Sequence, residues 1–135
     1  MSDTTSENLI KNALQPVFQK YSEKVILAYL FGSVAQHSSS LLSDLDIAVF
    51  LSSDAKYKYF DTKLSLYADF CRILKRNDID VIVLNSSTNI LLLDDIVRSG
   101  EVLFDSNRDL REEFELKVIH SSIDFKEQRL AVMGH

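Results

Sequence analysis

The sequence predicts an α/β (α+β) fold in which a mixed four-stranded sheet is flanked by helices and followed by a long C-terminal helix. Four short apolar runs, typical of buried strands, are separated in most places by segments with helical periodicity. The resulting order along the 135 residues is helix, strand, strand, helix, strand, helix, strand, helix, which indicates packed layers of helices and sheet. The connection between the first two strands is short, which favours an antiparallel pair and therefore a mixed sheet.

The first third of the chain is expected to form one helix and two strands. The helix covers about residues 7–20, and Pro16, the only proline, should kink or divide it. Residues 25–31 (VILAYLF) are an apolar run that predicts a buried strand ending at Gly32. Residues 44–51 predict the second strand, and the segment between the two strands is expected to be a loop.

A second helix is expected from about residue 56 to residue 76. Apolar residues recur there at spacings of four, three, four and three, which places them on one side of the helix. We expect this stripe to pack into the core, and the cysteine within it to be a buried, inert thiol. The stripe consists of Phe60, Leu64, Tyr67, Cys71 and Leu74.

The C-terminal half is expected to begin with a strand over residues 79–84 (IDVIVL). A polar segment then caps a helix over residues 89–99, and Gly100 follows where a residue in the left-handed conformation is expected. Residues 101–104 (EVLF) predict the fourth strand.

The last helix is expected to run from about residue 107 to residue 131, capped by Asp105 or Ser106. A helix of this length on a small domain covers a sheet or docks a partner, and we expect this one to contribute to partner docking. Its apolar side should include Leu116, Ile119, Ile123 and Leu130.

The composition is typical of a soluble globular protein, and we expect a single domain over residues 1–135. Hydrophobic residues make up 46% and charged residues 26%, and the net charge of −5 is not the basic surface expected for binding long nucleic acids. The single cysteine allows no internal disulfide. Residues 1–7 do not resemble a signal peptide, and no apolar segment approaches bilayer-spanning length, so we expect a cytoplasmic protein without a membrane partner.

Two acidic residues open the second strand, and a third lies in the third strand. Side chains at i and i+2 of a strand point to the same face, so Asp44 and Asp46 project two carboxylates together. If the second and third strands are neighbours, Asp80 can join them. Taken alone, Asp80 also fits a strand-end residue in water or a salt bridge with Arg76 or Lys75. Three clustered carboxylates suit hard divalent cations, which also hold the phosphates of a substrate.

Gly32 and Ser33 follow the first strand directly. A missing side chain at a strand end lets a ligand approach the backbone, and backbone N–H groups beside a hydroxyl bind phosphate oxygens. Taken alone, the pair also fits a tight turn. Together with the carboxylates it indicates a triphosphate and two metal ions, which would stabilise the attacking and leaving oxygens of an in-line displacement.

The spacing of these residues resembles the signature of the DNA polymerase β-like nucleotidyltransferases. Gly32-Ser33 is followed after ten residues by Asp44-Leu45-Asp46, and Asp80 matches the third carboxylate of that signature. The resemblance extends from about residue 25 to residue 104. The size of the chain is similar to that of the minimal members, the MNT proteins, which are commonly antitoxins paired with HEPN-domain ribonuclease toxins.

The resemblance implies a nucleotidyltransferase fold and a function. The expected reaction is the magnesium-dependent transfer of AMP from ATP to a tyrosine hydroxyl of the cognate HEPN toxin, which neutralises that toxin. Asp44 and Asp46 would ligate the metal that carries the triphosphate. Asp80 would help to hold a second Mg²⁺ ion and would polarise the attacking hydroxyl. Gly32 and Ser33 would seat the β- and γ-phosphates.

The loop after Gly32-Ser33 departs from the family pattern, in which arginines and a second glycine are frequent. Val34, Gln36 and His37 stand there instead, which removes positive charge expected near the phosphates. Two alternative functions therefore stay open. The chain could be a non-catalytic antitoxin that covers its toxin, or a nucleotidyltransferase that acts on a small-molecule hydroxyl.

Overall fold

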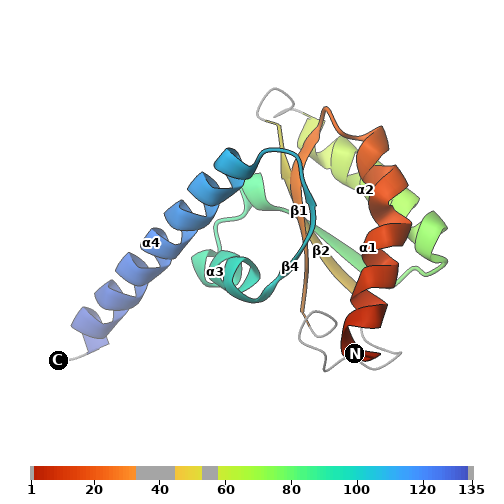
Figure 1. Ribbon diagram of the computed structural model, residues 1–135. Coiled ribbons are helices and arrows are strands. Elements are labelled where there is room, and N and C mark those ends of the chain that lie inside the picture. The colour runs from red at the N-terminus through yellow and green to blue at the C-terminus, as the bar shows by residue number, and fades with distance from the viewer. Residues whose placement is uncertain (1, 33–44, 53–57, 134–135) are drawn as a thin grey trace.

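The computed structural model describes residues 2–32, 45–52 and 58–133 (Figure 1). Within these ranges helices and strands follow the order expected from the sequence. In chain order they are α1 (Ser2–Lys20), β1 (Val25–Phe31), β2 (Leu45–Leu51), α2 (Tyr59–Leu74), β3 (Ile79–Val83), the 3-10 turn η2 (Leu84–Ser86), α3 (Ile90–Ser99), β4 (Glu101–Asp105) and α4 (Arg108–Met133).

The four strands form one mixed sheet in the order β3-β2-β1-β4. Strand β1 runs antiparallel to both β2 and β4, whereas β2 and β3 are parallel. The antiparallel first pair and the mixed sheet are confirmed. Because β3 follows β2 through the crossover helix α2, the two can lie parallel and adjacent.

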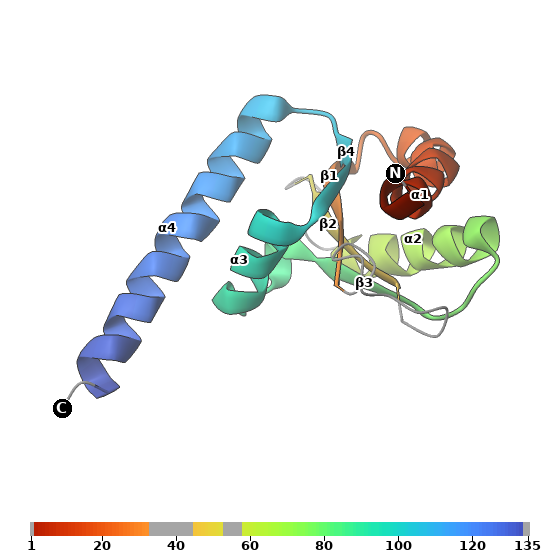
Figure 2. The ribbon, with the colours of Figure 1, turned by 60° about the horizontal axis from the view of Figure 1, so that its bottom comes forward.

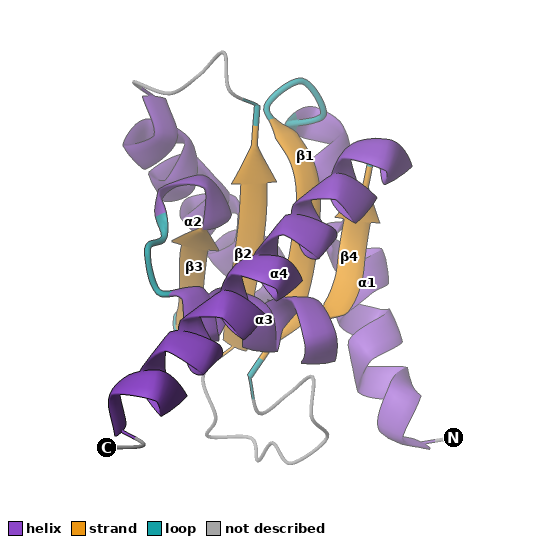
Figure 3. Cartoon of the chain, turned by 90° about the vertical axis from the view of Figure 1, so that its left-hand side faces the viewer, coloured by secondary structure: helices purple, strands orange, loops and turns teal. Residues whose placement is uncertain are grey.

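Helices α1 and α2 cover one face of the sheet, and α3 and α4 lie against the other face (Figures 2 and 3). Each strand therefore buries side chains on both sides, which explains why the strands are nearly continuous apolar runs. The core between the sheet and α1 and α2 includes Leu14, Phe18, Leu30, Ile47, Val49, Leu66, Phe70 and Val81. The core on the α3 side includes Leu27, Tyr29, Phe31, Ala48, Leu84, Leu93, Ile96 and Val118.

Helix α1 is continuous through Pro16, so the expected division at this residue is wrong. Proline removes one backbone donor and crowds the preceding turn. Pro16 is exposed, whereas Leu14, Val17 and Phe18 are buried in the core. Packing of these neighbours holds the helical turn in place despite the lost hydrogen bond.

The buried face of helix α2 coincides only in part with its apolar stripe, because Cys71 and Leu74 are partly buried against the core and the start of the stripe is exposed. Phe60 and Leu64 are 67% and 50% exposed, and the buried residues of the helix include Leu66, Asp69 and Phe70. Periodicity misses this face because it contains a carboxylate. The buried Asp69 is compensated by hydrogen bonds and ion pairs with Lys20, Tyr21 and Arg72.

Two predicted caps are also wrong. Gly100 has an extended backbone, with φ −74° and ψ 154°, rather than a left-handed one. A side chain is excluded there for another reason, because a Cβ would lie 2.5 Å from the carbonyl oxygen of Ile96. At the start of α4 the cap is Asn107, whose side chain accepts a hydrogen bond from the backbone N–H of Leu110 (3.1 Å).

Helix α4 is attached to the domain by its first half. The hydroxyl of Tyr29 donates to Glu115 (2.5 Å), and Arg111 pairs with Asp105 (2.6 Å) and with Glu115 (3.1 Å). Burial and the neighbouring Glu115 carboxylate raise the pKa of the Tyr29 hydroxyl. One further ion pair, from Lys126 to Asp94 of α3 (3.3 Å), ties the helix down farther along.

The second half of α4 extends away from the sheet (Figure 2). Three of the four residues expected on its apolar side are exposed, Leu116 by 58%, Ile123 by 44% and Leu130 by 71%. Val118 is the buried apolar residue of the helix, so most of the expected apolar side is left uncovered by the domain. In the described part of the chain, the helices are too short or too polar to cross a membrane.

Candidate functional site

The glycine that ends β1 lies against a carboxylate of the neighbouring strand. Phe31 pairs with Asp46 across the β1–β2 ladder, and Gly32 is the next residue. Gly32 has φ 86°, a conformation that other residues rarely adopt. A Cβ built there would overlap Oδ2 of Asp46 and lie 3.3 Å from its Cγ. Both the backbone conformation and the close approach therefore require glycine.

The acids of the second and third strands are direct neighbours. Asp46 of β2 and Asp80 of β3 are partners in the parallel ladder. Paired residues point to the same face, and adjacent strands lie about 4.8 Å apart. Both carboxylates therefore project from the α3 side of the sheet, next to Gly32, with Asp46 half-buried and Asp80 exposed.

The salt bridge considered for Asp80 does not form with Arg76. The guanidinium of Arg76 binds Asp78 through two hydrogen bonds of 2.5 and 2.6 Å, and this contact lowers the pKa of the Asp78 carboxyl. Among the described residues the side chain of Asp80 has no ion-pair or hydrogen-bonding partner. The carboxylate of Asp80 is thus exposed to solvent and available to a ligand.

The structure brings together three of the predicted site residues, namely Gly32, Asp46 and Asp80. Asp44 and Ser33 lie outside the described residues, as does His37. Within the described ranges there is no group of three or more histidine, cysteine, aspartate or glutamate side chains that could hold a metal. Two adjacent carboxylates beside an open backbone nevertheless fit a hard divalent cation, because Mg²⁺ prefers oxygen ligands and is commonly held by one or two carboxylates.

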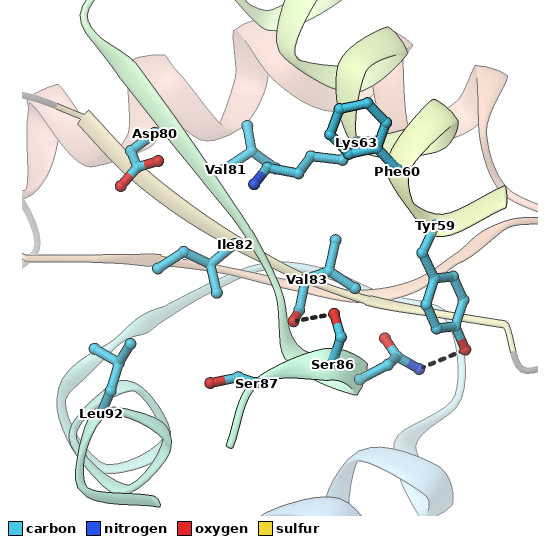
Figure 4. A pocket seen from close by; sticks show the side chains of 11 residues that line it. Tyr59, Phe60, Lys63, Asp80, Val81, Ile82, Val83, Ser86, Ser87 and Leu92 are labelled. Atoms are coloured by element: carbon cyan, nitrogen blue, oxygen red, sulfur yellow. Dashed lines mark hydrogen bonds between the residues drawn. The ribbon is translucent and has the colours of Figure 1, made fainter. Parts of the chain in front are cut away.

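A groove with a volume of about 820 Å³ runs along β3 beside Asp80 (Figure 4). Its floor is β3 itself, and α2 supplies one wall through Tyr59, Phe60 and Lys63. Sequence reasoning missed these three residues as site residues. The three residues lie within one and a half turns at the start of a helix, and this spacing could have identified them as one surface. Only the sheet order places this surface beside the strand that carries Asp80.

Asn85 holds the far end of this groove in shape. Its side-chain oxygen accepts a hydrogen bond from the backbone N–H of Leu51 (2.8 Å), and its amide donates to the carbonyl of Leu51 (2.8 Å). The same amide group donates to the hydroxyl of Tyr59 (3.2 Å). Asn85 thus joins the end of β2 to the first turn of α2, which fixes the wall that faces β3.

Comparison with known proteins identifies the fold and the family. The family profile described as "Polymerase beta, Nucleotidyltransferase" matches residues 12–109. A chain of the crystal structure described as a toxin–antitoxin with AMP-PNP is 26% identical, with a TM-score of 0.70 over 92% of this chain and 95% of that one. No curated protein matches this sequence.

Two further solved structures share the fold. A chain of the MntA–HepT toxin–antitoxin structure is 24% identical, with a TM-score of 0.65 over 94% of this chain and 96% of that chain. A protein from Shewanella oneidensis is 21% identical, with a TM-score of 0.64 over 93% of this chain and 94% of its own. The expected nucleotidyltransferase fold is therefore confirmed.

Proposed function

This chain belongs to the polymerase beta nucleotidyltransferase family, and from that premise we propose that it transfers AMP from ATP to a tyrosine hydroxyl of a HEPN-domain toxin. In this role it is an antitoxin that acts in the cytoplasm. The observation that carries the proposal is the pairing of Asp46 with Asp80 beside the open backbone of Gly32. The similarity to a toxin–antitoxin chain solved with AMP-PNP supports both the nucleotide and the kind of partner.

The proposed roles are those that the family signature implies for each residue. Asp44 and Asp46 would hold the Mg²⁺ ion that carries the triphosphate, and Asp80 would help to hold a second ion. Gly32 and Ser33 seat the β- and γ-phosphates, because backbone N–H groups beside a hydroxyl can bind phosphate oxygens. Bound Mg²⁺ supplies positive charge that offsets the charge developing on the attacking and leaving oxygens.

The reaction is an in-line displacement at the α-phosphorus of ATP. The acceptor oxygen forms a bond to that phosphorus, the bond from it to the bridging oxygen of the β-phosphate breaks, and pyrophosphate leaves with the electron pair. The exposed carboxylate of Asp80 orients the acceptor hydroxyl and takes its proton, which then passes to water.

An exposed stripe on α4 supports a protein partner. Leu116, Ile123 and Leu130 are seven residues apart, so they lie on one side of the helix, and all three are exposed. Apolar side chains gathered on a projecting helix are typical of protein–protein contacts. We therefore assign this stripe to toxin docking, which brings the acceptor tyrosine to the carboxylates.

The test is intact-mass spectrometry of the cognate toxin after incubation with this protein, ATP and Mg²⁺. We expect the toxin to gain the mass of AMP, and Asp46→Asn or Asp80→Asn to reduce the rate by roughly 10²-fold or more. Asp109→Asn is the matched control, because this exposed acid lies at the start of α4, at the other end of β1 from Gly32. A toxin that is neutralised without gaining mass would establish the non-catalytic alternative instead.

A further inference from the structure

The parts of the candidate site follow one another across the sheet. Gly32 lies at the end of β1, Asp46 on β2 and Asp80 on β3, and β3 is the edge strand of the order β3-β2-β1-β4. Neighbouring strands lie about 4.8 Å apart, so roughly two strand spacings separate Gly32 from Asp80. Among the described residues, those that line the groove come from α2, β3, the segment after β3 and α3, and none comes from β1 or β2. The groove therefore lies on the side of Asp80 that is remote from Gly32.

An in-line displacement makes these two sides chemically different. The attacking and leaving oxygens lie on opposite sides of the reacting phosphorus. In the proposed function the β- and γ-phosphates bind at Gly32, so pyrophosphate leaves on the side of β1. The acceptor hydroxyl then enters on the side of Asp80, next to the groove. The walls of the groove are thus in a position to contact the acceptor rather than the phosphates of ATP.

One of these walls carries a cation without a partner. Lys63 and Asp80 are the charged residues among the described residues that line the groove. Lys63 is half-buried, and within the described part of the chain its side chain forms no ion pair or hydrogen bond. Figure 4 shows the side chain extending from α2 toward β3, with its amino group in the groove. A lysine ammonium is a mobile point charge, and partial removal from water strengthens its attraction for an anion.

We propose that Lys63 selects the protein acceptor by pairing with an acidic side chain that lies close to the acceptor tyrosine. The inference rests on the proposed function, since it concerns how the protein substrate is recognised beside the same carboxylates. Phe60 lines the same wall and is 67% exposed, so it offers an apolar contact next to the charge. Lys63 is thus a specificity-determining residue, and it takes no part in the transfer of AMP.

The phosphates of ATP are the other anions that could attract Lys63. They bind at Gly32, however, and the carboxylates of Asp46 and Asp80 lie between Gly32 and the groove. An acidic residue of the acceptor approaches from the open side of the groove and meets Lys63 first. Complementary charges of this kind favour the correct partner and weaken the binding of others.

Charge variants of Lys63 in the full-length protein test this pairing. Lys63→Met should raise the KM for the toxin about fivefold, the upper range for a partly exposed ion pair. Lys63→Glu should raise it roughly tenfold or more, because repulsion replaces attraction. Lys63→Arg should retain most of the wild-type affinity. The kcat and the KM for ATP should keep their wild-type values in all three variants.

Lys58→Glu is the matched control. Lys58 is an exposed lysine at the start of the same helix, it makes no side-chain cap and it lies outside the groove. The control changes the net charge by the same amount as Lys63→Glu, so it separates a specific pair from a general effect of charge on association. We expect Lys58→Glu to leave the KM for the toxin unchanged.

A charge swap then identifies the acidic partner. Peptide mass spectrometry locates the modified tyrosine, and each acidic residue of the toxin near this tyrosine is replaced by lysine in turn. One such toxin variant should be a poor substrate for the wild type and a good substrate for Lys63→Glu, and the absence of any such rescue would overturn the pair.

Three further results would contradict the role of Lys63 while leaving AMP transfer established. These are a wild-type KM for the toxin in Lys63→Glu, an equal rise of that KM in Lys58→Glu, and a raised KM for ATP in Lys63→Met. Absence of any AMP transfer by the wild type would instead overturn the proposed function itself.

Discussion

The carboxylate of Asp46 rests against the backbone of Gly32, so closely that a Cβ on Gly32 would overlap Oδ2 of Asp46. This contact couples the end of β1 to the acid of β2. Gly32 is therefore expected to tolerate substitution poorly, because both its backbone conformation and the contact with Asp46 require glycine.

Replacement of Gly32 by alanine is expected to reduce AMP transfer by roughly 10²-fold, because the new methyl group displaces the Asp46 carboxylate from its position. The positive φ adds a stability loss of about 1–2 kcal/mol. Steady-state kinetics and thermal denaturation measure the two effects. Gly100→Ala is the control: its Cβ would press on the Ile96 carbonyl, so the melting temperature should fall while turnover per folded molecule is preserved.

Removal of divalent cations is expected to abolish AMP transfer, because adjacent carboxylates and a triphosphate repel one another without positive charge between them. EDTA should stop the reaction, and excess Mg²⁺ should restore it. A second readout is the melting temperature, which added Mg²⁺ and ATP should raise in the wild type. The same addition should have little effect on Asp46→Asn, and an equal rise in that variant would contradict the assignment.

The hydrogen bonds and ion pairs of the Asp69 carboxylate are expected to make the protein less stable at acidic pH. Burial works to raise the pKa of Asp69, but hydrogen bonds from Lys20 (3.0 Å) and Tyr21 (2.8 Å) outweigh it and lower the pKa below its usual 3.8. A carboxyl group whose pKa is lower in the folded than in the unfolded state stabilises the fold at pH values above its unfolded pKa. This contribution is lost as the pH falls through its folded pKa.

Asp69→Asn should therefore destabilise the fold by about 1–2 kcal/mol at neutral pH, through the loss of charge-assisted hydrogen bonds. Urea denaturation measures this difference from the wild type. The difference should shrink as the pH falls below 3.8 and through the lowered pKa of the folded protein, because the wild-type carboxylate then also becomes protonated. A gap between the two proteins that does not depend on pH would show that the charge of Asp69 contributes nothing.

The exposed stripe on α4 is expected to matter for binding and not for folding. Ile123→Asp together with Leu130→Asp should weaken the complex with the toxin at least tenfold, as measured by titration calorimetry. Because both side chains are exposed, the free energy of unfolding should change by no more than about 0.5 kcal/mol for each.

Phe125→Asp is the matched control for the stripe, because Phe125 is also exposed and lies on the other side of the same helix. This variant should bind the toxin as the wild type does. Equal weakening by all three substitutions would mean that the whole end of α4, rather than one side of it, contacts the partner.

Local sequence determined the strands and the face of the sheet on which each acid lies, whereas the pairing of Asp46 with Asp80 depended on the strand order. The apolar run over residues 25–31 predicted β1 with its observed bounds, and alternation placed Asp46 on the face opposite Ile47 and Val49. Side chains alternate between the two faces of a strand with a period of two, so the face of one residue fixes the faces of the others. The polymerase beta signature then identified the family from residues that are 48 positions apart at most, counted from Gly32 to Asp80.

The faces of the helices were decided only by the tertiary structure. In α2 the buried side contains Asp69, which is tolerated because Lys20 and Tyr21 reach it from α1. No pattern within α2 reveals those partners. In α4 the apolar residues Ile123 and Leu130 are exposed because the helix leaves the sheet before them (Figure 2).

The groove beside β3 likewise exists only in three dimensions. Lys63 and Asp80 line one groove because β3 is placed at the edge of the sheet and α2 packs beside it. Strand order depends on which surfaces bury the most apolar area together, a property of the whole chain and not of any segment. The sequence by itself therefore determined which residues carry the chemistry, and the packing of the sheet decided which surface can present a substrate to them.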